Sequence, residues 1–213
     1  MAGPGCGKTA LCCELVWPTA LEGRQIALSK KVLGYYFCQA HDIETLSITN
    51  FIHCLVGQFV KAACIPGYEQ HLKKSDIKIA LDPLECERNP DHAFQKAILE
   101  PLQKMPAPSS PQLIVVDSID ESYLQSISDR TSGSRTIAEL LSNHHHSFPN
   151  WLLLICSARK QSKSVTRLFT GFRKISLDDL RKTHVVRDVQ QYILCRLDKE
   201  EDLRQHLSRD TAE

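Results

Sequence analysis

Hydrophobic positions along the chain follow two different spacings. Continuous apolar runs predict buried strands, because a strand that is covered on both faces has no polar side. These runs lie at 31–38, 112–117, 151–158 and 172–177. Apolar residues three or four positions apart predict helices with one buried face. This spacing is found at 45–63, from Asn89 to Leu102, around Leu140 and at 186–197.

Strands that alternate with helices predict an α/β fold in which a doubly wound parallel sheet carries helices on both faces. The charged stretch 68–88 has little pattern, and we interpret it as an insertion with one short helix. The stretch 122–134 is rich in Ser and Gly and predicts a mobile loop. We expect a core at 1–180 and the start of a following helical region at 181–213.

The first ten residues carry the most specific motif of the chain. A phosphate-binding loop has Gly, four residues, Gly-Lys and then Ser or Thr. Gly7, Lys8 and Thr9 fit this pattern, while Ala2 stands where the first Gly belongs. A predicted helix at 10–17 follows at once, and its N-terminus would direct its dipole at the phosphates. The alternative, a disordered Gly- and Pro-rich start, is disfavoured by that helix.

This motif assigns roles to individual residues. We expect backbone N–H groups of the loop to hold phosphate oxygens, with Lys8 at the β- and γ-phosphates and the Thr9 hydroxyl on Mg²⁺. The predicted cofactor-binding residues are Gly3, Gly5, Cys6, Gly7, Lys8, Thr9 and Ala10.

Three acids and an arginine follow predicted strands, at the carboxyl ends where parallel sheets bind ligands. Asp117 ends the run 112–117 and is predicted to bind Mg²⁺. Asp120 and Glu121 lie just beyond, where a carboxylate would orient or deprotonate water, or would merely cap a loop or helix. Arg159 follows the run 151–158, and its fork suits a γ-phosphate. A surface Arg that pairs with a neighbouring acid is the alternative.

Composition argues against several classes of protein but indicates no specific function. The chain has 213 residues and a net charge of +1, which gives no argument for binding nucleic acid. Nine cysteines, an odd number, argue against a disulfide framework and favour free thiols. The longest apolar run, 151–156, is too short to span a bilayer.

Four segments together carry a family resemblance. They are AGPGCGKTALC at 2–12, LIVVDSIDE at 113–121, WLLLICSARKQS at 151–162 and FRKISLDDLRKTHVVRDVQQYILCRL at 172–197. The set resembles the STAND class of P-loop NTPases, the NACHT-like signalling ATPases. More narrowly, it looks like the NTPase domain of ankyrin-repeat proteins such as the TANC scaffolds. The narrower resemblance rests on 151–197, whereas the loop is common to P-loop NTPases.

The resemblance implies ATP and Mg²⁺ as cofactors, with Lys8 and Thr9 on the nucleotide and Asp117 on the metal. The acidic pair of the class falls on Asp120 and Glu121, and its arginine falls on Arg159. The class implies a slow nucleotide-driven switch in a larger scaffold, whose ankyrin repeats outside this chain bind protein partners. It allows oligomerisation and implies a cytoplasmic protein; near relatives suggest a peripheral place at endosomal or synaptic membranes.

The chain departs from the class at both ends. Members carry a strand before the loop and continue into further modules, whereas only Met1 precedes this loop, so we expect a fragment of a longer protein. In the family's sheet the absent strand lies between the strands that end at Asp117 and Arg159. We therefore expect these two strands to lack partners on their facing edges.

The sequence leaves several functions open. The first is a switch with slow ATP hydrolysis, and the second is a scaffold or interaction module that does not hydrolyse nucleotide. A small-molecule kinase is a third, but neither an arginine-bearing lid nor an acceptor pocket is evident. A Ras-type GTPase is disfavoured because no Asn-Lys-x-Asp motif occurs, so ATP is favoured over GTP.

Overall fold

The computed structural model describes residues 5–19, 22–123, 135–177, 187 and 190–191. The chain divides into two compact units, residues 1–173 and 174–213, and almost all described residues belong to the first. The predicted helix at 186–197 and most of the predicted loop at 122–134 lie outside the described residues. The domain boundary after residue 180 stays a prediction for the same reason.

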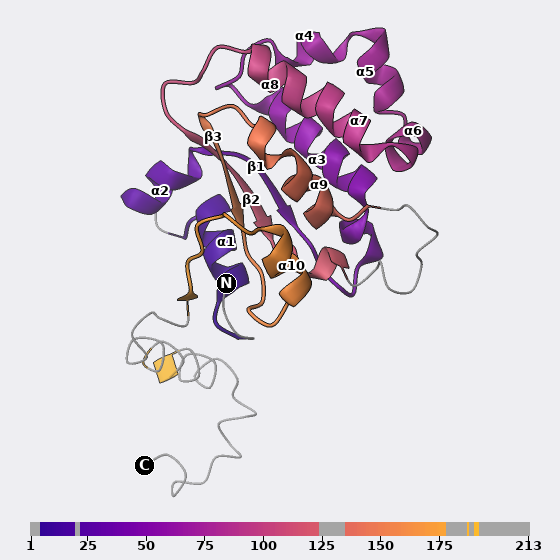
Figure 1. Ribbon diagram of the computed structural model, residues 1–213. Helices are drawn as coiled ribbons and strands as arrows, with labels where there is room; N and C mark the ends of the chain where they lie inside the picture. The colour runs from indigo at the N-terminus through magenta and orange to yellow at the C-terminus, as the bar shows by residue number, and fades with distance from the viewer. Residues whose placement is uncertain (1–4, 20–21, 124–134, 178–186, 188–189, 192–213) are drawn as a thin grey trace, which may run out of the picture. The chain divides into compact units, whose positions relative to one another are not determined.

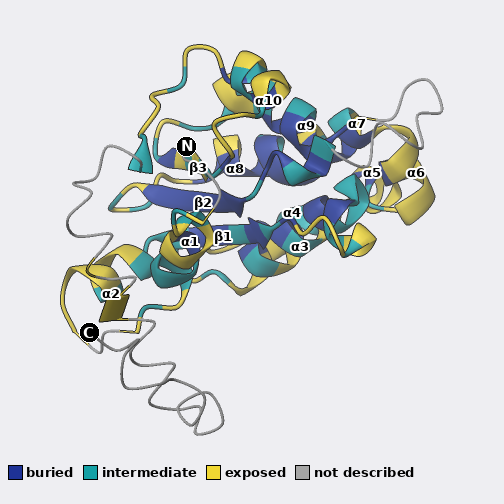
Figure 2. Ribbon diagram, turned by 90° about the horizontal axis from the view of Figure 1, so that it is seen from below, coloured by how far each residue is buried: buried dark blue, intermediate teal, exposed yellow. Residues whose placement is uncertain are grey.

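The predicted α/β class with a parallel sheet is confirmed. Within the described residues the sheet has three parallel strands in the order β1-β2-β3 (Figure 1). They are β1 (Val32–Phe37), β2 (Gln112–Asp117) and β3 (Leu152–Cys156). Every residue of the central strand β2 is buried, as Figure 2 shows by its dark colour. This burial explains why its sequence reads as an uninterrupted apolar run.

The strand that ends at Asp117, β2, and the strand that comes before Arg159, β3, pair directly with each other. The register runs from Gln112 opposite Leu152 to Val116 opposite Cys156. Our expectation that their facing edges would lack partners is therefore wrong. An unpaired buried N–H or C=O group costs about 1–3 kcal/mol, so two adjacent apolar strands satisfy each other's backbone groups.

Helices lie on both faces of the sheet, as predicted. On one face lies α1 (Lys8–Val16), and the following Trp17 stacks on Phe37 with ring centroids 5.5 Å apart. On the other face α3 (Ile48–Lys61) brings Phe51 edge-on to Tyr36 at 5.2 Å. Tyr36 and Phe37 serve opposite faces because successive side chains of a strand alternate.

The strand β3 is less buried than its sequence predicts. Leu153 and Ile155 are 51% and 36% exposed, whereas their register partners Leu113 and Val115 on β2 are buried. The reason is position: β3 is an edge strand, and on this face α1 packs over β1 and β2. A strand's own residues do not reveal whether a helix will cover it.

The edge of β1 is closed by a side chain of α3. Gln58 accepts a hydrogen bond from the Tyr35 N–H at 2.7 Å and donates one to the Tyr35 carbonyl at 2.9 Å. The amide thus replaces one residue of a neighbouring strand. Close approach is needed here, because a Cβ on Gly34 would lie 2.9 Å from side-chain atoms of Leu55 and Phe59. Gly34 therefore lets α3 sit directly on β1.

Three short helices occupy the stretch that we expected to contain one. They are α4 (Tyr68–Leu72), α5 (Ser75–Ala80) and α6 (Pro83–Arg88). Their buried residues are Tyr68 in α4, Ile77 and Ala80 in α5, and Cys86 in α6. One or two buried residues give no visible periodicity, which is why the sequence pattern missed these helices.

The remaining elements are also short. They are α2 (Arg24–Ser29), η1 (Ile43–Leu46), η3 (Glu121–Tyr123), α9 (Ile137–His144), η5 (His145–Ser147) and α10 (Lys163–Leu168). The predicted strand at 172–177 is wrong, since these described residues form no strand and Ile175 is 66% exposed. Adjacent Arg173 and Lys174 interrupt its apolar pattern. Among the described residues no helix has the length and apolar character to cross a membrane.

One long helix contains a π-helical segment whose cause is visible in the sequence. The helix consists of α7 (Pro90–Phe94), the π segment η2 (Gln95–Leu99) and α8 (Glu100–Lys104), and Asn89 caps its start as predicted. Pro101 has no N–H to give to the Ala97 carbonyl four residues earlier. The Tyr68 hydroxyl donates to that carbonyl instead, at 2.6 Å, and Tyr68 is only 1% exposed.

This arrangement predicts coupling between Tyr68 and Pro101. Tyr68→Phe should lower the free energy of unfolding by about 1–3 kcal/mol, because it removes the hydroxyl that donates to a buried carbonyl. In a Pro101→Ala background the new N–H can serve Ala97, so the same substitution should cost clearly less. Urea unfolding of the four proteins of this cycle measures the difference. Equal costs in both backgrounds would contradict the assignment.

Candidate functional site

The glycine-rich loop has two glycines in the left-handed region of backbone conformation. Gly5 and Gly7 have φ values of 75° and 74°, in the left-handed region, and Gly7 is the N-cap of α1. The helix begins at Lys8 and its first bond runs from the Leu11 N–H to the Gly7 carbonyl at 2.9 Å. The first N–H groups of a helix have no partners within it and point outward. Gly3 lies outside the described residues, whereas Cys6, Lys8, Thr9 and Ala10 follow the loop into α1.

Thr9 and Asp117 meet although 108 residues separate them. The Thr9 hydroxyl donates to Asp117 Oδ2 at 2.7 Å. Asp117 ends β2 and is 2% exposed, so its carboxylate is held in a nearly dry position. The sequence predicted these two residues as ligands of one metal ion, and the fold brings their oxygens together.

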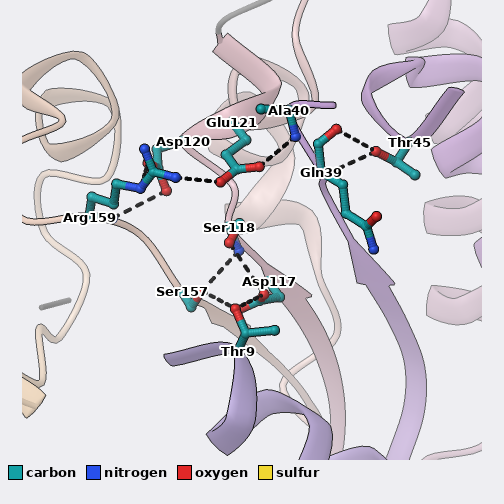
Figure 3. A network of polar contacts seen from close by, with 10 residues as sticks. All are labelled: Thr9, Gln39, Ala40, Thr45, Asp117, Ser118, Asp120, Glu121, Ser157 and Arg159. Carbon is teal, nitrogen blue, oxygen red and sulfur yellow. Dashed lines mark hydrogen bonds and ion pairs between the residues drawn. The ribbon is translucent and has the colours of Figure 1, made fainter. Parts of the chain in front are cut away.

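Ser157 fixes the other oxygen of Asp117. Its hydroxyl donates to Asp117 Oδ1 at 2.5 Å and accepts from the Ser118 N–H at 2.9 Å (Figure 3). The Ser118 hydroxyl also reaches Asp117 Oδ2 at 3.3 Å. Ser118 has φ 51°, an uncommon conformation for a residue with a side chain, which such bonds help to hold.

Two buried thiols adjoin this carboxylate. Burial, reinforced by the negative charge of Asp117, raises the pKa of Cys12 to about 12, and Cys12 also hydrogen-bonds Asp117. Burial and the charges of Asp117, Glu121 and Asp120 raise the pKa of Cys38 to about 12 as well. Both groups therefore stay protonated at neutral pH and are poor nucleophiles. Within the described residues, three hydroxyls and a thiol, all neutral, bond Asp117.

A second polar centre lies just beyond, at the start of η3. Glu121 Oε1 pairs with Arg159 Nη2 at 2.6 Å, while Glu121 Oε2 accepts from the Ala40 N–H at 2.6 Å (Figure 3). Asp120 accepts from the Arg159 N–H at 3.2 Å and lies 3.8 Å from its Nε. Both carboxylates are largely buried, with side chains 8% and 13% exposed, whereas Arg159 is 49% exposed.

The turn that follows β1 is attached to both centres. The Cys38 N–H donates to the Asp117 carbonyl at 3.1 Å, and the Ala40 N–H donates to Glu121. Within the turn the Asp42 N–H donates to the Gln39 carbonyl at 3.0 Å, and the Gln39 N–H donates to the Thr45 hydroxyl at 2.8 Å. These hydrogen bonds hold the turn in place beside the ends of β1 and β2.

These elements enclose a pocket of about 310 Å³. This is at the small end of the range of roughly 300–1,000 Å³ for ligand sites, so it fits a compact polar group. The lining residues come from α1, the end of β1, the turn after it and the end of β2. They are Thr9, Phe37, Cys38, Gln39, His41, Asp117, Ser118 and Glu121.

The structure therefore groups the sequence-predicted residues into two clusters. Thr9 and Asp117 form one, and Asp120, Glu121 and Arg159 form the other, in which the arginine pairs with the acids. Sequence reasoning missed Ser157, Gln39 and His41. A signal existed for Ser157, since it directly follows β3 at the ligand-binding edge of a parallel sheet. Gln39 and His41 lie in a turn whose path no pattern predicts.

Comparison with known proteins identifies the family. Residues 1–159 match the family described as nephrocystin 3, N-terminal. No solved structure matches the chain. The match covers the loop, β1, β2, β3 and Arg159, and it agrees with the NACHT-like part of the resemblance without extending to ankyrin-repeat or TANC proteins. The chain belongs to the nephrocystin 3 N-terminal family, a NACHT-related family.

Proposed function

We propose that this site binds Mg²⁺ and ATP in the manner of a P-loop NTPase. The observation that carries the proposal is the contact of 2.7 Å between the Thr9 hydroxyl and Asp117. A hydroxyl from the first turn after a glycine loop and a carboxylate from a strand end are the two protein ligands of Mg²⁺ in such proteins. The fold must bring together two residues that are 108 positions apart in the sequence. The sequence motifs had predicted that both would bind the same metal ion.

The donor set around Asp117 suits a hard cation. Buried carboxylates are normally paired with a charge, because an isolated buried charge is costly. Among the described residues, the hydroxyls of Thr9, Ser118 and Ser157 and the thiol of Cys12 bond Asp117, and these four groups are neutral. Oxygen ligands of this kind are what Mg²⁺ prefers. When bound, the ion would neutralise negative charge on the phosphates.

Different residues of the chain would bind the phosphates and activate water. The loop from Gly3 to Ala10 would hold the phosphates through its N–H groups, and Lys8 would add positive charge. Glu121 or Asp120 would take a proton from an attacking water. Both oxygens of Glu121 are occupied in this structure, one of them by Arg159. We propose that the half-exposed Arg159 turns to the terminal phosphate, which frees Glu121 for water.

At the level of the whole protein we propose a slow nucleotide-driven switch. Support comes from the membership of a NACHT-related family and from the resemblance to STAND proteins. The ankyrin-repeat scaffold, the cytoplasmic location near endosomal or synaptic membranes and the protein partners are parts of the same proposal. They rest on the resemblance of 151–197. The alternative is a scaffold module that does not hydrolyse nucleotide, favoured by the engagement of Glu121 described above.

Substitution of Lys8 tests nucleotide binding. Lys8→Ala should weaken ATP affinity by about 1.5–3 kcal/mol, the value of a hydrogen bond to a charged group. Calorimetry with Mg·ATP and Mg·GTP measures the loss and the base preference. Lys78→Ala, at an exposed position of α5, is the matched control and should bind as the wild type does. Equal affinities for wild type and Lys8→Ala would contradict the proposal.

Ser157 should act through the metal carboxylate. Ser157→Ala removes the donor to Asp117 Oδ1, so ATP affinity should fall when Mg²⁺ is present and change little in EDTA. Ser157→Thr retains a hydroxyl and should recover most of the affinity. Ser29→Ala removes a hydroxyl that donates to the Ile26 carbonyl in α2, and serves as the control. A loss of the same size with and without Mg²⁺ would indicate a purely structural role.

Turnover is separated from binding at Glu121. Glu121→Gln retains an acceptor for the Ala40 N–H but cannot take a proton, so hydrolysis should fall about 100-fold or more. ATP affinity should stay within about threefold of the wild-type value. Phosphate release under single-turnover conditions, with Asp120→Asn for comparison, gives both quantities. If the wild-type protein binds ATP and never hydrolyses it, the scaffold alternative replaces the ATPase.

A further inference from the structure

In the part of the chain that the structure describes, some polar side chains that line the pocket have hydrogen-bond partners, and others do not. Thr9 and Ser118 are bonded to Asp117, and Glu121 is bonded to Arg159 and Ala40. The side-chain amide of Gln39 and the ring of His41 line the same pocket. Within the described residues neither of these two polar groups has a hydrogen-bond or ion-pair partner.

The backbone that carries these two side chains is fixed from several directions. The Thr45 hydroxyl bonds the Gln39 N–H and lies 3.1 Å from the Gln39 carbonyl, as Figure 3 shows. Between Gln39 and His41, the Ala40 N–H is held by Glu121. These bonds attach the turn to η1 and η3. The polar groups of Gln39 and His41 are therefore presented to the pocket from a backbone that is already in place, which lowers the ordering cost of binding.

The charges around the pocket indicate which kind of ligand the Gln39 amide and the His41 ring could bind. Two carboxylates, Asp117 and Glu121, line the pocket, and they repel an anion that enters it. A bound Mg²⁺ and the loop lysine compensate part of this repulsion. An additional phosphoryl group still requires N–H donors on the side of the pocket away from α1. An imidazole has a ring N–H in both protonation states, and a Gln amide has two N–H donors.

We propose that Gln39 and His41 contact the terminal phosphate and make the site distinguish a nucleoside triphosphate from a diphosphate. The inference rests on the proposed function, because the loop at α1 must first hold the phosphates. Thr9, from α1, lines the same pocket as Gln39 and His41, which come from the turn after β1. These two residues thus give the switch its nucleotide preference, while the loop gives it affinity for both nucleotides.

The test compares two affinities in the full chain. Calorimetry with Mg²⁺ measures the dissociation constants of ADP and of a non-hydrolysable ATP analogue for the wild type, Gln39→Ala, His41→Ala and the double variant. We expect the analogue to bind the double variant about tenfold more weakly, with ADP affinity within about twofold of the wild-type value. His41→Gln supplies an N–H and should recover part of the preference. His53→Ala, an exposed histidine of α3, is the matched control.

The outcomes separate this inference from the proposal on which it depends. If the wild type binds neither nucleotide, the proposed function fails, and this inference fails with it. If the wild type binds both and the variants retain its preference, or lose both affinities equally, only the inference is overturned. Thermal melts without nucleotide show whether the variants are folded. Both side chains are exposed, so the melting temperature should stay at the wild-type value.

Discussion

The constraint on which the site depends is the burial of one negative charge. Asp117 ends the central strand at 2% exposure, and its contacts are with neutral donors from three parts of the chain. Thr9 comes from the first helix, Ser118 from the residue after β2 and Ser157 from the residue after β3. A buried carboxylate is tolerated only with such a set of donors, so its environment dictates where the ends of α1 and β3 lie. Burial, together with the same charge, raises the pKa of the adjoining thiols of Cys12 and Cys38.

A second carboxylate, that of Glu121, connects the segments that follow the two outer strands of the sheet. Glu121 bridges the Ala40 N–H, beyond the outer strand β1, and Arg159, beyond the opposite edge strand β3. One side chain at the end of the central strand therefore ties the loops of both neighbouring strands together. The ion pair joins a half-exposed cation to a largely buried anion. Under the proposed function, a ligand that moved one of these loops would act on the other through Glu121.

How far the sequence predicted this structure differs between elements. The run 112–117 was predicted without error because a central strand is covered on both faces by any arrangement of helices. The run 151–158 was predicted as a strand, but the exposure of Leu153 and Ile155 depends on which helix covers the edge. The motif predicted the meeting of Thr9 with Asp117. The roles of Gln39 and His41 depend on how a turn folds back against Glu121, which no local pattern records. Short helices with one or two buried residues were missed because so few positions show no periodicity.

The helix that follows the glycine-rich loop, α1, has only one buried residue, Cys12. It is held at its start by Thr9 on Asp117 and at its end by Trp17, which is 54% exposed, on Tyr35 and Phe37. An element with so little buried apolar surface opens at a low free-energy cost. Under the proposed function, ligand binding at its first turn would then be partly a local folding reaction, and some of the contact energy would be used to order the helix. The aromatic contact of Trp17, at the far end of α1 from the loop, would then set how much of that energy remained as affinity.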